Sequence, residues 1–376
     1  MRNIIDYVNQ YGKMSFQKVP FGDVDSLIFS ELAYLKYDIF FRGEAATNNA
    51  LTLKELSHAP DMEELFKGLH DPIPNRALLF AVANSYRFGS TIVDYYSNLL
   101  DEEKEVQFSA VTFFPKGELP YLAFRGTDET LIGWKEDFNM AFISPVPSQE
   151  MGVAYLEQLV PKLYGDFRMG GHSKGGNIAV YTAIKADAVR QDRISAVYSH
   201  DGPGFQNELL EDQGYLAISN RIFKTIPQSS IVGLLLQHQE AYKVIKSSKL
   251  GLLQHDPFSW IVQKGSFIYL EDVDANAMFM NQTLNQWLTD LGEEERKEFI
   301  NLIFGLFSAT EISTVNELTE EWRRVLSGLI EARKELDSET VQFLHQTLRQ
   351  LMHMGTKNLS VIGRRKKTIS KARGNK

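Results

Sequence analysis

The spacing of apolar residues predicts helices in the first part of the chain. Between residues 23 and 41, apolar positions recur at the three- and four-residue intervals of one helical face, and Asp23 is of a type that caps helix N-termini. These positions are Val24, Leu27, Ile28, Leu32, Leu35 and Ile39. Helical spacing continues to about Leu100. The sequence therefore predicts an N-terminal helical region over residues 1–100.

Two apolar runs after Val106 predict the first strands of a sheet. The first run reaches Phe114 and is followed by Pro115-Lys116-Gly117, which is typical of a turn. The second run occupies residues 121–124. We expect these two strands to open the sheet.

Strand and helix patterns then alternate to about residue 272. Helical spacing covers residues 149–163 and resumes near Gly175. The strand candidates are residues 167–170, 194–198, 221–226 and 242–246. Strands separated by helices indicate a mostly parallel sheet with helices on both faces. The predicted fold class is α/β, with the sheet in a core of residues 101–272.

Helical spacing returns from residue 273 onward, and the chain ends in a cationic cluster. The cluster consists of Arg364, Arg365, Lys366, Lys367, Lys371, Arg373 and Lys376. A solvated tail is the favoured interpretation, and contact with anionic lipid or nucleic acid is the alternative. Residues 273–376 are therefore expected to form a C-terminal helical region with a basic tail.

Composition excludes several classes of protein. A formal net charge of −8 argues against a nucleic-acid binder that works through general basicity. The sequence contains 0 cysteines, which excludes disulfides, thiol catalysis and cysteine-ligated metals. The N-terminus has no apolar segment typical of a secretion signal, and no apolar run is long enough to span a bilayer. We expect a soluble cytoplasmic protein, with peripheral membrane contact as an open alternative.

The segment Gly171-His172-Ser173-Lys174-Gly175 fits the Gly-x-Ser-x-Gly nucleophile elbow. The elbow places a serine on a sharp strand-to-helix turn, and its glycines allow strand and helix to approach closely. A strand pattern precedes this segment and a helical pattern follows it, which favours an elbow over an ordinary glycine-rich turn. Ser173 is the predicted nucleophile, and His172 is expected to pack beside the strand end.

The segment Phe124-Arg125-Gly126-Thr127 closes the second predicted strand. A strand end that precedes the nucleophile can supply one oxyanion N–H, and the residue after the nucleophile supplies the other. The backbone amides of Thr127 and Lys174 are therefore the predicted oxyanion donors. The alternative is a tight turn stabilised by Arg125 and Asp137.

These segments resemble the class 3, fungal-type lipases, which carry Phe-Arg-Gly-Ser/Thr, Trp-x-x-Asp and Gly-His-Ser-x-Gly at comparable spacing. The matching residues are 124–127, Trp134 with Asp137, and 171–175. Asp-Gly-Pro-Gly at residues 201–204 and Gln-His-Asp-Pro at residues 254–257 look like a bacterial branch of that superfamily. Over residues 105–270 the resemblance implies an α/β-hydrolase core, acyl-ester hydrolysis and a lid at residues 128–134.

The triad order in this fold is serine, acid, histidine, so the base is expected C-terminal to Ser173. His200, His238 and His255 qualify by position. His255 is favoured because it follows the strand candidate at Val244 and opens a loop.

The acid departs from the class 3 pattern. In those lipases it follows the strand after the one that leads to Asp201, but the matching residues 225–230 contain no carboxylate. Pancreatic-type lipases place the acid one strand earlier, and Asp201 stands there. Asp256 is a poor choice because a side chain seldom orients the ring of its immediate neighbour, here His255. Asp201 is therefore the predicted acid.

The predicted function is cleavage of a small-molecule or lipid carboxylic ester through an acyl-enzyme, with no metal and no cofactor. Two alternatives remain open. The missing carboxylate at residues 225–230 motivates a non-catalytic binding or scaffold protein that retains the fold. A peptidase or amidase would use the same triad.

Overall fold

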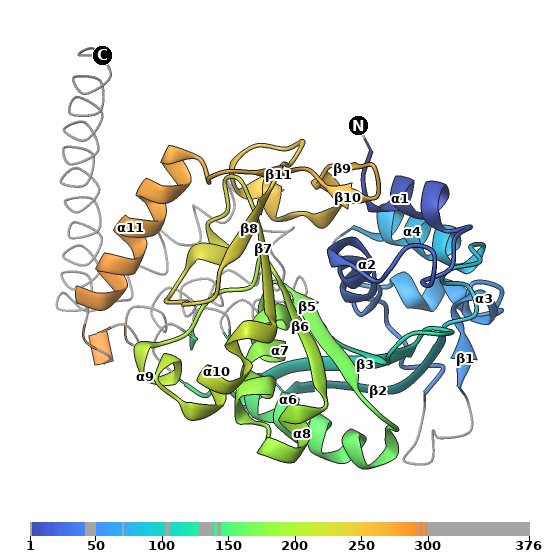
Figure 1. Ribbon diagram of the computed structural model, residues 1–376, viewed down its shortest axis with the longest axis horizontal. Coiled ribbons are helices and arrows are strands. Elements are labelled where there is room, and N and C mark those ends of the chain that lie inside the picture. Colours follow the sequence, from blue (N-terminus) through green and yellow to red (C-terminus); the bar gives the residue numbers. More distant parts are fainter. Residues whose placement is uncertain are drawn as a thin grey trace, which may run out of the picture. The chain divides into compact units, whose positions relative to one another are not determined.

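The computed structural model of the protein describes residues 2–41, 50–69, 71–101, 106–127, 136, 139–140, 144–290, 292, 294–295 and 298 (Figure 1). The chain divides into two compact units, Met1–Asp272 and Val273–Lys376. In the second unit the structure describes one long helix, α11 (Ala275–Asp290). The basic tail predicted after residue 363 lies outside the described residues. No helix in these described ranges combines the length and apolar character needed to cross a bilayer.

A nine-stranded sheet forms the centre of the first unit, in the order β1-β2-β3-β4-β5-β6-β7-β8-β11. The strands are β1 (Leu51–Thr52), β2 (Ile92–Asp101), β3 (Val106–Phe114), β4 (Tyr121–Phe124), β5 (Phe167–His172), β6 (Ile194–His200), β7 (Ile222–Pro227), β8 (Tyr242–Ile245) and β11 (Tyr269–Leu270). Strands β4 to β8 are parallel, whereas β1 to β4 and the pair β8/β11 are antiparallel. The prediction of an α/β fold is confirmed. The mostly parallel sheet is confirmed for the middle strands, and the edges make the sheet mixed.

The crossover helices lie together on one face of the sheet. Strands β4 to β8 are neighbours in both sequence and space, and right-handed crossovers between such strands place their helices on the same face. Between β4 and β7 the connecting helices are α6 (Pro147–Leu159), η3 (Val160–Lys162), α7 (Lys174–Lys185), α8 (Ala188–Asp192), α9 (Asn207–Leu210), α10 (Gln213–Ile218) and η4 (Ser219–Arg221). Leu156 of α6 and Ile178 of α7 share one hydrophobic cluster with Leu122 and Phe124 of β4.

The N-terminal helices cover the opposite face (Figure 1). They are α1 (Ile4–Tyr11), α2 (Asp23–Leu32), α3 (Leu53–Leu56), η2 (Met62–Phe66) and α4 (Pro72–Ala83). Leu27 and Phe29 of α2 share a second cluster with Phe113, Tyr121 and Ala123. Because side chains alternate along a strand, Tyr121 and Ala123 point to this face while their neighbours in β4 point to the other.

The predicted first helix is shorter in the structure than the apolar spacing indicated. α2 starts at Asp23, but its N-cap is Gly22, and the carboxylate of Asp25 accepts from the Gly22 amide at 3.0 Å. The helix ends at Leu32. Leu35 is fully buried in the turns that follow, so its apolar character reflects burial and not a further helical turn.

The sheet begins earlier than Val106, which corrects the expectation that the two strands after Val106 open the sheet. β2 pairs with β3 along its length, but its register shifts between Asp94 and Ser97, and Tyr95 has a positive φ of 51°. This bulge breaks the alternation of buried and exposed side chains that identifies a strand in a sequence. β2 therefore lacked a regular strand pattern.

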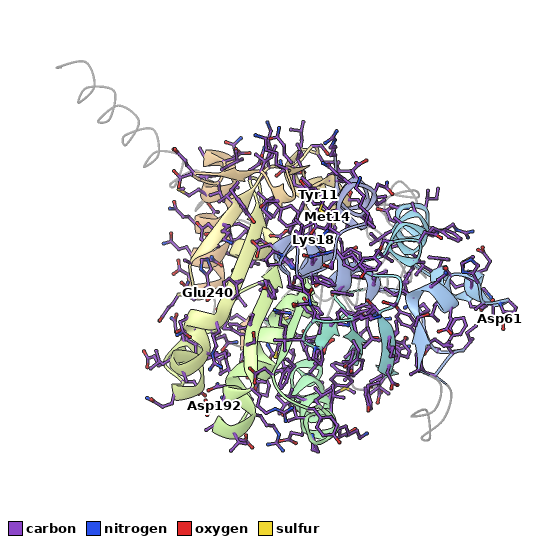
Figure 2. The ribbon with its side chains drawn as sticks, turned by 45° about the vertical axis from the view of Figure 1, so that its right-hand side comes forward. Tyr11, Met14, Lys18, Asp61, Asp192 and Glu240 are labelled. Atoms are coloured by element: carbon purple, nitrogen blue, oxygen red, sulfur yellow. The ribbon has the colours of Figure 1, made fainter. Side chains whose placement is uncertain are left out.

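Asp25 and Arg87 form a buried ion pair inside the N-terminal layer. Asp25 accepts from Nε and Nη2 of Arg87 at 2.8 and 2.7 Å, and from the Tyr7 hydroxyl at 3.1 Å. Tyr7 stacks on Tyr11, labelled in Figure 2, with 5.1 Å between ring centroids. The remaining short strands are β9 (Val262–Gln263) and β10 (Ser266–Phe267), which form a separate two-stranded sheet.

Candidate active site

Ser173 lies on a sharp turn between a strand and a helix. β5 ends at His172 and α7 begins at Lys174, so one residue joins them. Its angles, φ 58° and ψ −133°, lie in a region that costs a non-glycine residue on the order of 1–3 kcal/mol. The Ser173 amide donates to the carbonyl of His200 at 2.9 Å, and its carbonyl accepts from Gly176 at 2.9 Å. The fold thus holds the serine in a strained conformation at the carboxyl end of β5.

Close backbone approach explains both glycines of the motif. A Cβ on Gly171 would lie 2.3 Å from the carbonyl carbon of Gly175, and a Cβ on Gly175 would lie 2.1 Å from the carbonyl oxygen of Phe124. These distances are far below van der Waals contact, and backbone atoms cannot rotate away as the end of a side chain can. The strand–turn–helix geometry expected around Ser173 is therefore present, and it depends on the absence of side chains at these two positions.

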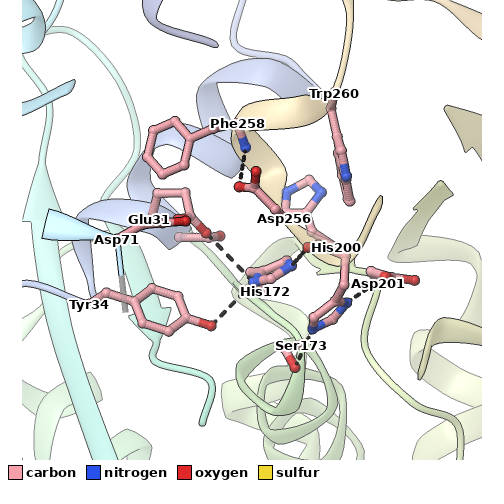
Figure 3. A network of polar contacts seen from close by, with 12 residues as sticks. Glu31, Tyr34, Asp71, His172, Ser173, His200, Asp201, Asp256, Phe258 and Trp260 are labelled. Atoms are coloured by element: carbon pink, nitrogen blue, oxygen red, sulfur yellow. Dashed lines mark hydrogen bonds and ion pairs between the residues drawn. The ribbon is translucent and has the colours of Figure 1, made fainter. Parts of the chain in front are cut away.

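His255 reaches the serine from much later in the chain. It ends the short helix η6 (Gly251–His255), and its Nε2 lies 2.9 Å from the Oγ of Ser173, which is labelled in Figure 3. The His255 side chain is 30% exposed and Ser173 is 8% exposed. The serine hydroxyl is thus largely enclosed, while the imidazole beside it retains access to solvent.

Asp201 completes the hydrogen-bonded path. It follows β6 directly, has a φ of 52°, and its Oδ2 lies 2.6 Å from His255 Nδ1. A carboxylate only accepts, so Nδ1 must carry the proton and Nε2 is left as an acceptor for a serine proton. Asp256 instead accepts from the Phe258 amide at 2.9 Å and pairs with Lys249 at 2.7 Å. The structure brings Ser173, His255 and Asp201 together, and Asp256 has other partners.

Two residues that the sequence analysis did not single out hold Asp201. The Ser230 hydroxyl donates to Asp201 Oδ1, and the Gly233 amide donates to the same oxygen at 3.2 Å. A Cβ on Gly233 would lie 2.3 Å from that oxygen, so this position requires glycine. Both residues belong to the loop after β7, which begins in the segment 225–230 that contains no carboxylate. Their position after a strand end was the only available sequence signal.

The other candidate histidines contact different groups. His200 is buried, with Nε2 2.8 Å from Ser26 Oγ and Nδ1 2.7 Å from Thr225 Oγ1, and burial lowers its pKa to about 4. His238 packs edge-on against Tyr242, with ring centroids 5.3 Å apart. Burial is also the main cause that lowers the pKa of His238. Neither contact set includes the serine.

The loop after β4 touches the turn at Ser173. A Cβ on Gly126 would lie 3.1 Å from the Cβ of Ser173. Thr127 is the next residue and is half-buried, and the amide of Lys174 follows the serine directly. Both predicted oxyanion donors therefore belong to segments that flank the serine. Arg125, from the alternative turn interpretation, donates to Asn98 Oδ1 at 3.2 Å.

The Lys174 side chain has a separate role that its position in the motif did not indicate. Its ammonium is buried and donates to Glu136 Oε2 at 2.8 Å and to the carbonyl of Gln107 at 3.0 Å. Glu136 Oε1 in turn accepts from the amide of Ser148 at 2.9 Å. This pair joins the first residue of α7 to β3 and α6, and so anchors the turn that carries Ser173.

Several predicted features lie outside the described residues. These are Trp134, Asp137 and the lid expected at residues 128–134. Among the residues that are described, no group of three or more His, Asp or Glu side chains could hold a metal ion.

The sequence matches a known protein family. A family model described as Mbeg1-like matches residues 82–305, which is more than half of the sequence. The chain belongs to the Mbeg1-like family. The Mbeg1-like segment contains Ser173, Asp201, Ser230 and His255, together with β2 to β8, and it excludes helices α1 to α3.

Two solved structures resemble this Mbeg1-like protein distantly. One is M37 lipase, with 16% identity over 56% of this chain and 67% of that chain, and a TM-score of 0.36. The other is the lipase from Rhizopus microsporus var. chinensis, with 15% identity over 65% of this chain and 89% of that chain, and a TM-score of 0.33. No curated protein matches the sequence. The assignment to class 3 lipases and to a bacterial branch stays a prediction.

Proposed function

We propose that the chain is a serine hydrolase with an α/β-hydrolase core that cleaves acyl or lipid carboxylic esters. The observation that carries this proposal is the continuous path from Ser173 Oγ to His255 Nε2 at 2.9 Å, and from His255 Nδ1 to Asp201 Oδ2 at 2.6 Å. A hydroxyl is a weak nucleophile until an adjacent base takes its proton, and the base is effective when a third group orients it. The three side chains stand in that order.

In the proposed reaction, Ser173 Oγ attacks the ester carbonyl carbon while its proton passes to His255 Nε2. The tetrahedral intermediate then collapses, the carbon–oxygen bond to the leaving alcohol breaks, and the imidazolium returns its proton to that oxygen. Water repeats the two steps on the acyl-enzyme and releases the acid. Asp201 stabilises the imidazolium each time it forms.

The oxyanion is assigned to the backbone amides of Thr127 and Lys174. Lys174 is the first residue of α7, and the N-terminal amides of a helix carry partial positive charge. Such fixed donors stabilise charge that develops in the transition state, because they need not reorient when it forms. The buried Lys174–Glu136 pair supports this role by holding the start of α7 in place.

The proposal is tested with a fluorophosphonate probe, which reacts with activated serines. Purified wild-type protein is labelled, and the modified residue is found by mass spectrometry, with Ser173→Ala and His255→Ala alongside. Ser219→Ala is the matched control, since Ser219 precedes β7 at the opposite end of the sheet. We expect labelling of wild type and Ser219→Ala at residue 173, and loss of labelling in the other two variants.

Folded wild type that does not label contradicts the proposal and favours a binding or scaffold protein on the same fold. The sequence motive for that alternative was the missing carboxylate after β7, and the Asp201–His255 contact weakens it. Ester and amide substrates with the same acyl group separate an esterase from an amidase. We expect faster turnover of the ester, and a preference for the amide would reassign the substrate class.

A further inference from the structure

His172, inside the serine motif, lies against the residue proposed as base. Its Nε2 is 2.9 Å from the main-chain carbonyl oxygen of His255, and the centroids of the two imidazole rings are 4.6 Å apart with 34° between their planes. His172 is labelled in Figure 3. His172 is 5% exposed, and Trp260 packs edge-on against its ring at 6.2 Å. The ring thus contacts both the backbone and the side chain of His255.

The hydrogen bonds of His172 define its protonation. A carbonyl oxygen only accepts, so Nε2 carries a proton, and Nδ1 of the neutral ring is then an acceptor. The Tyr34 hydroxyl lies 3.2 Å from Nδ1 and can donate to it. Burial, with smaller effects of His255 and His200, places the pKa of His172 well below its usual value. The ring is therefore uncharged near neutral pH.

Glu31 of α2 faces the same ring, but it does not favour protonation of His172. Its Oε1 lies 3.6 Å from His172 Nδ1 and has no hydrogen-bond partner among the residues that the structure describes. Burial, and then the charges of Asp256 and Asp71, raise the pKa of Glu31 well above its usual value. Burial thus favours the neutral form of Glu31, which exerts less pull on a proton at Nδ1 than a carboxylate would. This environment favours the neutral form of His172 that donates through Nε2.

A neutral donor at this place suits a histidine that must become charged. His255 takes up a proton when Ser173 reacts in the proposed mechanism, and a second charged ring at 4.6 Å would oppose that step. The bond to the His255 carbonyl also fixes the main chain from which the base projects. Small displacements of a reacting group lower rates strongly, since proximity and alignment supply much of the rate enhancement.

We propose that His172 is a positioning residue for His255, which it holds through the Nε2–H bond to the main chain and the contact between the two rings. This inference rests on the proposed function. In this role His172 contacts neither the substrate nor the reacting atoms. The Tyr34 hydroxyl maintains the tautomer of His172.

The test separates the donor from the ring. His172→Gln keeps an N–H donor and loses the ring, whereas His172→Phe keeps a ring and loses the donor. We expect His172→Phe to label with the fluorophosphonate about 10- to 100-fold more slowly than wild type. His172→Gln should recover at least about a third of the wild-type rate, because the bond to the carbonyl is restored. The same two substitutions at exposed His58 are the controls.

A second measurement does not depend on turnover. The proton between His255 Nδ1 and Asp201 is expected to give a strongly downfield proton NMR signal, assigned by its loss in His255→Ala. The signal should persist in His172→Gln and weaken in His172→Phe. If wild type shows the signal but does not label, the proposed function fails and the positioning of His255 is still tested.

Equal labelling rates and equal signals in His172→Phe and wild type overturn the inference. So does a His172→Gln variant that is as slow as His172→Phe, because the donor would then be irrelevant. Tyr34→Phe guards against a variant that does not fold, since it removes one hydroxyl and leaves the ring of His172 in place. We expect it to slow labelling about 3- to 10-fold, and an unchanged rate counts against the inference.

Discussion

Asp25 and Asp201 are each 1% exposed, yet different partners hold them. Asp25, in the N-terminal layer, accepts two bonds from Arg87, and its pKa is raised by burial while Arg87 opposes the rise. Arginine is a permanent cation with a rigid fork of donors, so the partner of Asp25 does not change its charge with pH. The role of Asp25 therefore does not depend on a partner that changes its charge.

The Asp201 region has a partner that can change its charge. Asp201 Oδ2 accepts from His255, and Oδ1 accepts from the Ser230 hydroxyl and the Gly233 amide. An imidazole can take up the proton of a serine that reacts beside it, so a carboxylate next to the imidazole can stabilise a charge that appears only during the reaction. Equal burial of two carboxylates therefore does not imply equal roles. The residue that holds each carboxylate decides whether a substitution changes stability or activity.

Asp201→Asn gives the largest expected effect and falls on activity. The amide cannot stabilise an imidazolium and disturbs the tautomer of His255, so we expect the labelling rate to fall about 10⁴-fold. Ser230 and Gly233 can still donate to the amide oxygen, so unfolding by urea should shift little. An asparagine variant that labels as fast as wild type would remove Asp201 from the proposed triad.

Asp25→Ala should do the reverse. Removal of Asp25 leaves Arg87 buried without its carboxylate, and a broken buried pair costs about 3–5 kcal/mol of the free energy of unfolding. The labelling rate of the protein that remains folded should not change, because no contact of Asp25 includes Ser173. Asp61→Ala, at the exposed aspartate labelled in Figure 2, is the matched control and should change neither property. A loss of labelling in folded Asp25→Ala would contradict the separation of the two regions, because Asp25 would then affect activity as well as stability.

His200 joins the two regions and predicts a pH dependence. It contacts Ser26 of α2 and Thr225 of β7, and burial lowers its pKa from 6.5 to about 4. The unfolded chain therefore binds more protons between these two values, so stability falls as pH drops through that window. At 1.36 kcal/mol per pKa unit the loss by pH 4 is about 3 kcal/mol.

Urea unfolding from pH 7 to pH 4 measures this loss. His200→Gln should be less stable at pH 7, because it loses packing, but its stability should depend less steeply on acid. His58→Gln, at an exposed histidine, should keep the wild-type slope. His172 adds a loss of the same sign, since its pKa is also lowered by burial. An unchanged slope in His200→Gln would mean that His200 does not titrate in this window.

The parts of the molecule that could be predicted from sequence are those with local signals. β3 to β8 and α7 carry regular apolar patterns. Ser173 and Asp201 directly follow strands, where parallel strands gather side chains, and His255 lies in the segment after β8. The bulge in β2 hid that strand, because a one-residue insertion reverses the alternation.

The supporting contacts could not be predicted in the same way. Ser230 is 29 residues from Asp201, and Tyr34 is 138 residues from His172, so each contact depends on how separate loops and layers come together. Serine and tyrosine are also common in loops and helices, and nothing local distinguishes these two. These contacts exist only in the folded chain, and substitutions measure what each contributes.

The smallest expected effects come from removing one hydroxyl in each region. Ser230→Ala takes a neutral donor from Asp201, and Tyr7→Phe takes a neutral donor from Asp25. A hydrogen bond to a charged group contributes about 1.5–3 kcal/mol, and a nearby second donor reduces the loss. We expect Ser230→Ala to slow labelling about 10-fold with little change in urea unfolding.

Tyr7→Phe is expected to lower the free energy of unfolding by about 1–2 kcal/mol and to leave labelling unchanged, because Arg87 still holds Asp25. The two substitutions remove the same chemical group from equally buried carboxylates, so a difference between their effects reports on the partner alone. If Ser230→Ala lowers stability without slowing labelling, then Gly233 and His255 suffice to orient Asp201. The loop after β7 would in that case stabilise the fold without tuning the base.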